Sequence, residues 1–103
     1  MSFKKIQEDV ERWTSQWEPQ YWEPHEIMAR IAEETGEIGR EINHVYGPKQ
    51  KKDEQKHNLG EEISDLIFAL ICLANSENID LDTEWQKMME KYDERDEDRF
   101  DKA

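Results

Sequence analysis

Two short acidic motifs contain the residues of this 103-residue chain whose types and spacing could do chemistry. The first is Glu33-Glu34-Thr35-Gly36-Glu37, and the second is Glu62-Ile63-Ser64-Asp65. Both lie in segments with helical patterning, where residues three or four apart share a face, so each motif turns at least two carboxylates the same way. Like charges repel, and the chain already has a formal net charge of -12. We therefore expect a cation between the two segments, and an all-oxygen donor set favours a hard ion such as Mg²⁺ or Mn²⁺.

The spacing of apolar residues predicts four helices and no strand, and so an all-α helical bundle in one domain covering 1–103. The helices are expected from about Lys4 to Trp17, from Pro24 to the Gly47-Pro48 stop, from Asn58 to a turn at 78–80, and from Leu81 into a charged tail. Asn58 and Glu61 have the spacing of a capping box that opens the third helix. This helix is apolar almost all round from Leu66 to Ala74, so we expect it in the middle of the assembly.

Helical geometry refines the acidic site. At roughly 100° per residue, Glu34 lies at the edge of the apolar stripe of the second helix, which predicts partial burial. Glu41 lies on the same acidic face outside the motif, and both an exposed position and a place near the site remain open. Small side chains continue below Glu62 and Asp65 on the third helix, which leaves room for a ligand; they are Ala69, Cys72 and Ser76.

Composition excludes several classes of partner. A pI near 4.6 argues against nucleic acid or an anionic membrane, because both need a basic surface. The longest apolar stretch is too short to span a bilayer, and the first residues lack the apolar run of a signal peptide. A single cysteine, Cys72, cannot form an internal disulfide, which fits a reducing cytoplasm. We therefore expect a cytoplasmic protein.

The two motifs together carry a family resemblance. Glu-Glu-x-x-Glu followed by Glu-x-x-Asp, with the lead-in Ala29-Arg30-Ile31-Ala32 and the tail from Lys91 to Phe100, resembles the MazG-like all-α nucleoside triphosphate pyrophosphohydrolases over nearly the whole chain. The resemblance implies hydrolysis of a nucleoside triphosphate (NTP or dNTP) to the monophosphate and pyrophosphate, by water attack at the α-phosphorus. It also implies a homodimer or homotetramer whose sites are completed by neighbouring chains.

The resemblance also implies roles for individual residues. The Mg²⁺ ligands carried over are Glu34, Glu37, Glu62 and Asp65. Glu33 is the candidate for orienting or deprotonating the water, although a supporting position behind the ligands is equally open. Lys91, with Arg95 on the same helical face, is expected at the substrate phosphates. Many relatives carry an asparagine where this chain has Cys72, so Asn75 is the substitute candidate for substrate binding.

The aromatic residues and the remaining polar residues allow more than one interpretation. Trp13 and Trp17, at helical spacing, are expected in the core, whereas Tyr21 and Trp22 are candidate pocket walls that could stack a nucleobase. His44 completes half of a di-iron pattern with Glu41 but has no second half, so a surface or interface position is expected. The lysines at 49, 51, 52 and 56 form one basic island.

Two other functions stay open from the sequence. One is a pyrophosphohydrolase for a biosynthetic nucleotide such as phosphoribosyl-ATP, whose enzymes resemble this motif layout. The other is a non-catalytic helical module whose acidic face binds a basic partner. Stabilisation by a divalent ion separates an enzyme site from a solvated acidic face, which would respond mainly to ionic strength.

Overall fold

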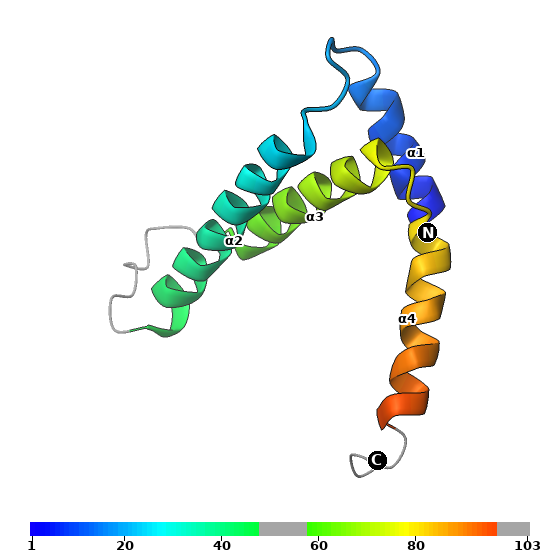
Figure 1. Cartoon of the computed structure of the whole chain (residues 1–103). Coiled ribbons are helices and arrows are strands. Elements are labelled where there is room, and N and C mark those ends of the chain that lie inside the picture. The colour runs from blue at the N-terminus through cyan, green and yellow to red at the C-terminus, as the bar shows by residue number, and fades with distance from the viewer. Residues whose placement is uncertain (48–57, 97–103) are drawn as a thin grey trace.

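The computed structural model describes residues 1–47 and 58–96, and the lysine island lies outside this part of the chain. Four helices follow one another (Figure 1): α1 (Phe3–Thr14), α2 (Pro24–Tyr46), α3 (Leu59–Ser76) and α4 (Leu81–Asp96). No strand occurs among the described residues, which confirms the all-α class. No helix in the described ranges has the length and hydropathy to cross a membrane.

Helices α2 and α3 run side by side and form one arm of the molecule (Figure 1). Pro24 opens α2, where its missing N–H costs no hydrogen bond, and the backbone N–H of Glu23 donates to the Glu26 carboxylate at 3.0 Å. The buried residues of α2 recur every seven positions, at Ile27, Glu34 and Glu41. The line of closest packing against α3 therefore includes two carboxylates.

Two helix ends differ from the sequence prediction. α1 ends at Thr14, not Trp17; the chain turns there, and Gln20 Nε2 from the connection donates to the Glu11 carbonyl of the last helical turn at 3.3 Å. The capping box predicted at the start of α3 is wrong, since the Asn58 side chain makes no capping hydrogen bond. The box forms instead at α2, where the Glu26 side chain reaches back to Glu23.

A small junction joins α4 to α1. The Asp82 carboxylate accepts from the backbone N–H groups of Phe3 and Lys4 at 3.0 and 3.1 Å, which satisfies two free donors at the start of α1. The Phe3 and Trp85 rings pack with centroids 5.3 Å apart. From this junction α4 runs away from α2 and α3, so the molecule is open and angular (Figure 1). Its radius of gyration is 17.4 Å, against roughly 13 Å for a compact domain of this length.

α3 is central, as expected, because it packs against both α1 and α2. One stripe of α3 nevertheless remains bare, with Ile63, Ile67 and Leu70 each more than two-fifths exposed. The buried apolar residues of the described chain are few: Val10, Ile27, Ala69, Ile71 and Ala74. A single copy therefore leaves much of its apolar surface in water.

Candidate functional site

Three acidic side chains converge where α2 faces the first turns of α3. Glu34, Glu62 and Asp65 each place a carboxylate oxygen within 4.8 Å of the others. Glu34 is one of the buried residues that recur every seven positions on the side of α2 facing α3, and it is only 8% exposed. Glu62 and Asp65 are one turn apart near the start of α3, where the helix dipole favours carboxylates. The structure therefore places together three of the four acids expected as metal ligands.

The fourth acid, Glu37, lies one turn beyond Glu34 on α2. Its side chain forms a salt bridge with Arg40, yet its charge still raises the pKa of Glu62. Glu33 lies one turn before Glu37 on the same side of α2 and is exposed. In the described part of the chain Glu33 makes no hydrogen bond or ion pair, so its carboxylate is available to a water molecule.

The electrostatics of this acidic cluster (Glu34, Glu37, Glu62 and Asp65) favour a cation. Loss of hydration raises the pKa of Glu62, and the negative charges of Glu37, Asp65 and Glu34 raise it further. Two arginines each pair with one member of the cluster: Arg40 with Glu37, and Arg30, whose Nε donates to Glu34 Oε1 at 2.8 Å. Sequence reasoning missed Arg30, although its position four residues before Glu34 was a usable signal.

The donor set of this cluster fits a hard divalent cation. All its donor atoms are carboxylate oxygens, and three of the acids already lie within the span that one ion can bridge. Glu34 is nearly buried, and its salt-bridge partner Arg30 is partly exposed. A second positive charge nearby would therefore stabilise the ionised carboxylate of Glu34. The arrangement therefore allows a divalent ion to be held between α2 and α3.

Replacing Glu62 by glutamine is expected to raise the thermal stability of the metal-free protein at neutral pH. The pKa of Glu62 in the folded state is raised above its usual range, so the folded protein binds this proton more tightly than the unfolded chain does. The contribution of Glu62 to the free energy of unfolding therefore grows as pH falls through the raised pKa. Circular dichroism melts of wild type and Glu62→Gln with a chelator, from roughly pH 5 to 8, check this. Glu77→Gln, at an exposed position past the end of α3, is the control, and an advantage of Glu62→Gln that persists unchanged at low pH contradicts it.

An aromatic cavity of about 400 Å³ adjoins the cluster and shares Asp65 and Arg30 with it. Its walls come from the end of α1, the α1–α2 connection and α3; the aromatic members are Trp13, Trp17, Tyr21, Trp22 and Phe68. Cys72 lines the same cavity, and burial raises the pKa of its thiol, which keeps it neutral. Tyr21 and Trp22 are therefore wall residues, as the sequence suggested.

The core positions expected for Trp13 and Trp17 are wrong, since these side chains are 53% and 54% exposed. α1 ends before Trp17, so the chain turns and both indoles face the cavity instead of the interior. Trp13 packs between its neighbours, with ring centroids 5.9 Å from Trp17 and 5.7 Å from Phe68.

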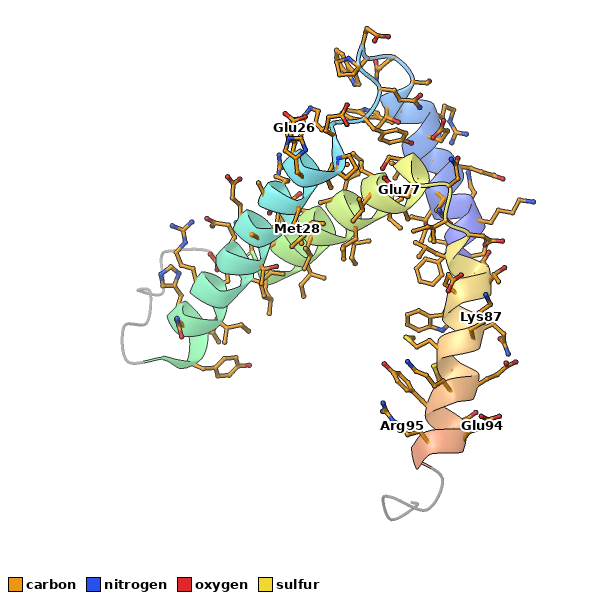
Figure 2. All side chains as sticks on the ribbon, in the orientation of Figure 1. Glu26, Met28, Glu77, Lys87, Glu94 and Arg95 are labelled. Carbon is orange, nitrogen blue, oxygen red and sulfur yellow. The ribbon has the colours of Figure 1, made fainter. Side chains whose placement is uncertain are left out.

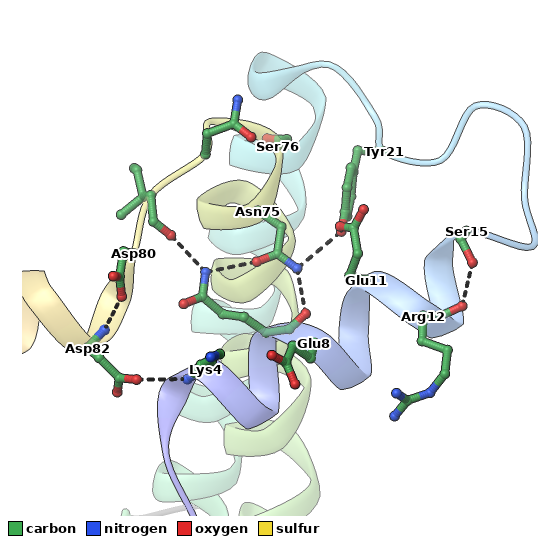
Figure 3. Close-up of a pocket in the computed structure, with 13 residues that line it drawn as sticks. Lys4, Glu8, Glu11, Arg12, Ser15, Tyr21, Asn75, Ser76, Asp80 and Asp82 are labelled. Carbon is green, nitrogen blue, oxygen red and sulfur yellow. Dashed lines mark hydrogen bonds between the residues drawn. The ribbon is translucent and has the colours of Figure 1, made fainter.

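Asn75 lies in a different hollow, beside α1 and the α3–α4 turn (Figure 3). Its Oδ1 accepts from Gln7 Nε2 at 2.9 Å, and its Nδ2 donates to the Gln7 carbonyl and to the Tyr21 hydroxyl at 3.0 and 3.1 Å. The Tyr21 hydroxyl in turn donates to the Glu11 carboxylate. The Asn75 amide is thus engaged within the chain and holds Tyr21 in place.

Lys91 and Arg95 lie on α4, and the structure does not bring them to the acidic cluster of the same chain. Both cations pack over Tyr92, at 5.6 and 4.9 Å from its ring centroid. Figure 2 labels Arg95 near the far end of α4, well away from α2 and α3. Glu41 is buried at 5% exposure beside His44, one turn past Glu37.

An all-α chain with facing acidic motifs next to an aromatic cavity fits a helical nucleotide hydrolase. Residues 22–100 match the model of the MazG nucleotide pyrophosphohydrolase domain. The protein YpjD of Bacillus subtilis strain 168 is 44% identical over 100 residues, covering 96% of this chain and 90% of YpjD. The chain belongs to the MazG nucleotide pyrophosphohydrolase family, and it is a hydrolase.

Two solved structures agree with this assignment. The crystal structure of Bacillus subtilis YpjD, whose name suggests a pyrophosphatase, is 43% identical with a TM-score of 0.82, covering 89% of this chain and 95% of that one. The structure of a Bacillus-conserved MazG protein, named as a nucleotide pyrophosphohydrolase, is 39% identical with a TM-score of 0.80, covering 96% and 97%. The family resemblance and the MazG-like all-α fold expected from the sequence are confirmed.

Proposed function

We propose that the protein is a Mg²⁺-dependent nucleoside triphosphate pyrophosphohydrolase that converts NTP or dNTP and water into NMP or dNMP and pyrophosphate. The observation that carries this proposal is the meeting of Glu34, Glu62 and Asp65 beside the aromatic cavity. A solvated acidic face would not bury one of its carboxylates to 8% exposure, which argues against the non-catalytic module.

The chain's own residues then have separate roles. Glu34, Glu37, Glu62 and Asp65 hold Mg²⁺, with Mn²⁺ as an alternative of the same coordination chemistry. When bound, the ion neutralises phosphate charge and makes a bound water more acidic. Glu33 orients the attacking water and accepts its proton. The water oxygen bonds to the α-phosphorus, the bond from that phosphorus to the α–β bridging oxygen breaks, and pyrophosphate leaves with the bridging oxygen.

The substrate's other parts face the remaining residues of the site. Tyr21 and Trp22 contact the nucleobase in the aromatic cavity. A cytoplasmic location is part of this proposal, and the nucleotide substrate and the free thiol of Cys72 support it. We also propose that residues 1–103 form one domain.

Hydrolysis in ¹⁸O-labelled water is expected to place the label in the monophosphate and none in the pyrophosphate. Attack at the α-phosphorus adds the water oxygen to that atom, whereas attack at the β-phosphorus would label the other product. Mass spectrometry of both products from ATP checks this, with separate detection of orthophosphate. Nucleoside diphosphate and orthophosphate as products would show that the reaction class is wrong.

We also propose a homodimer or homotetramer. The solvent-accessible surface is 8393 Å², against roughly 6,100 Å² for a compact protein of this mass. The excess is of the size that each partner hides in an obligate interface. α4 points away from the acidic cluster of its own chain (Figure 1). In an oligomer, Lys91 and Arg95 would instead reach a triphosphate bound to a neighbouring copy.

Light scattering at micromolar concentration is expected to give at least a dimer. Ile67→Glu, in the middle of the exposed α3 stripe, should shift the protein toward monomer because a charge cannot be buried there without a partner.

Lys91→Ala should keep the oligomer and lower kcat/KM by about tenfold, the scale of one charged phosphate contact. A stable, fully active monomer contradicts the assembly, and unchanged kinetics of Lys91→Ala return this residue to the solvated surface.

A further inference from the structure

We propose that Arg30 is a catalytic residue whose guanidinium group binds the α-phosphate of the nucleotide, both before hydrolysis and in the monophosphate product. This inference rests on the proposed function, because it assigns the residue that holds the reacting phosphate of that same substrate. Within one chain, neither the acids of the two motifs nor the cations of α4 supply a positive charge at that place.

Arg30 lies where the aromatic cavity and the acidic cluster meet. On α2 it comes between Ile27, which lines the cavity, and Glu34, which belongs to the cluster. α3 runs beside α2 and has the same order, since Asp65 belongs to both the cavity and the cluster and Glu62 to the cluster alone. The α-phosphate joins the nucleoside to the leaving pyrophosphate. A substrate with its base in the cavity and its leaving group at the metal therefore has this phosphate at the boundary.

Most of the hydrogen-bonding capacity of Arg30 is free. Its Nε donates to Glu34 Oε1 at 2.8 Å, and among the residues that the structure describes this is its one hydrogen bond or ion pair. Both Nη groups keep their donors, and the side chain is 45% exposed. A guanidinium group in this state can donate two parallel hydrogen bonds to two oxygens of one phosphate.

The charge of Arg30 acts inside the cavity. Burial raises the pKa of the Cys72 thiol, and the positive charge of Arg30 partly offsets this rise, so the guanidinium group lies near the sulfur. Cys72 is two turns beyond Asp65 on α3, on the cavity side of the cluster. Arg30 is also the one cationic side chain among the described residues that line the cavity. An anionic group that enters the cavity therefore has Arg30 as its partner.

The proposed reaction needs a positive charge at this boundary. Water attack gathers negative charge on the non-bridging oxygens of the α-phosphorus, and the phosphate of the monophosphate product keeps part of that added charge. Asp65 lies at the same boundary, and its negative charge repels the phosphate unless a cation lies beside it. A guanidinium group aimed at these oxygens stabilises the transition state more than the ground state.

Calorimetric titration with AMP and with adenosine, both in the presence of Mg²⁺, separates a phosphate contact from a base or sugar contact. Arg30→Gln should weaken the binding of AMP by about tenfold or more, the scale of a hydrogen bond to a charged group, and change the binding of adenosine by less than about twofold. Arg30→Lys keeps the charge without the planar fork, so it should recover part of the affinity for AMP. Equal losses for AMP and adenosine overturn the proposal.

Arg40→Gln is the matched control. Arg40 lies on the same helix and pairs with Glu37, another acid of the cluster, but it does not line the cavity. Its substitution removes the same charge near the cluster, so the affinity for AMP should fall by no more than about threefold, as expected for a screened, exposed charge. Equal losses in the Arg30→Gln and Arg40→Gln variants would mean that overall charge decides, and they overturn the proposal.

The response to Mg²⁺ separates a substrate contact from mere support of Glu34. If Arg30 only held Glu34 in place, Arg30→Gln would weaken the binding of the ion. With a direct substrate contact, thermal stabilisation of Arg30→Gln should need the same or a lower Mg²⁺ concentration, because a positive charge beside the cluster has been removed. The value of kcat/KM for ATP should still fall by roughly 100-fold. A loss of activity that excess Mg²⁺ restores overturns the proposal.

The two proposals fail in different ways. An active enzyme whose Arg30→Gln variant binds AMP as wild type does overturns the α-phosphate contact and leaves the pyrophosphohydrolase intact. Binding of AMP that depends on Arg30, in a protein that hydrolyses no nucleoside triphosphate, overturns the proposed reaction and supports the phosphate contact. Glutamine is a good helix former, so Arg30→Gln should fold, and its far-UV circular dichroism checks this.

Discussion

Glu37→Gln and Asp65→Asn are each expected to lower kcat/KM by roughly 100-fold or more, the scale for losing one group that stabilises charge in a transition state. Both substitutions keep the shape of the side chain and remove a negative charge from the acidic cluster. Steady-state pyrophosphate release from ATP at saturating Mg²⁺ measures the effect. Glu77→Gln is the matched control, because this exposed residue is outside the cluster and the cavity (Figure 2).

The fold should survive these substitutions. Removing one of several neighbouring negative charges relieves repulsion, so the metal-free variants should melt at or above the wild-type temperature. Wild-type turnover in both variants would remove Glu37 and Asp65 from the set of metal ligands, whereas loss of activity together with loss of helical signal would point to a structural role.

The second large effect is expected from the metal itself. Mg²⁺ or Mn²⁺ at about 100 times its dissociation constant should add roughly 2.7 kcal/mol to the free energy of unfolding. For a chain of this length that corresponds to a rise of roughly 10–20 °C in the melting temperature. Chelation should abolish turnover, and readdition of Mg²⁺ should restore it.

The control separates binding from screening. Na⁺ or K⁺ at matched ionic strength weakens the repulsion among exposed carboxylates but cannot bridge them, so it should give a much smaller rise. Glu37→Gln and Asp65→Asn should blunt the response to Mg²⁺ and leave the response to Na⁺ nearly unchanged. Equal stabilisation by both kinds of cation would identify the cluster as a solvated acidic face.

The sequence predicted the acidic cluster well because it depends on short-range geometry. Spacing of three and seven residues on α2 is enough to turn Glu34 toward α3, and its burial follows from the neighbouring apolar stripe. The order and type of the four helices followed for the same reason. Roles within the site, such as that of Glu33, depend on metal and substrate positions and stay predictions.

The sequence predicted only part of the aromatic cavity, the walls at Tyr21 and Trp22, because the rest depends on tertiary contacts. Helical spacing placed Trp13 and Trp17 in a core, but α1 ends at Thr14 and the Gln20 contacts with Glu11 fold the connection back. Such hydrogen bonds carry no periodic signal. The direction of α4 was equally hidden, since it depends on long-range contacts with α1, namely the Asp82 hydrogen bonds and the ring contact of Phe3 with Trp85.

The narrow junction at Asp82 has a consequence for cooperativity. Among the described residues α4 packs mainly against α1, so its backbone hydrogen bonds are supported by little buried surface. In an isolated copy this helix would open as a separate unit, at a lower free energy than the α2–α3 pair. The slowest-exchanging amides should therefore lie in α2 and α3, and strong protection of α4 would indicate the proposed oligomer.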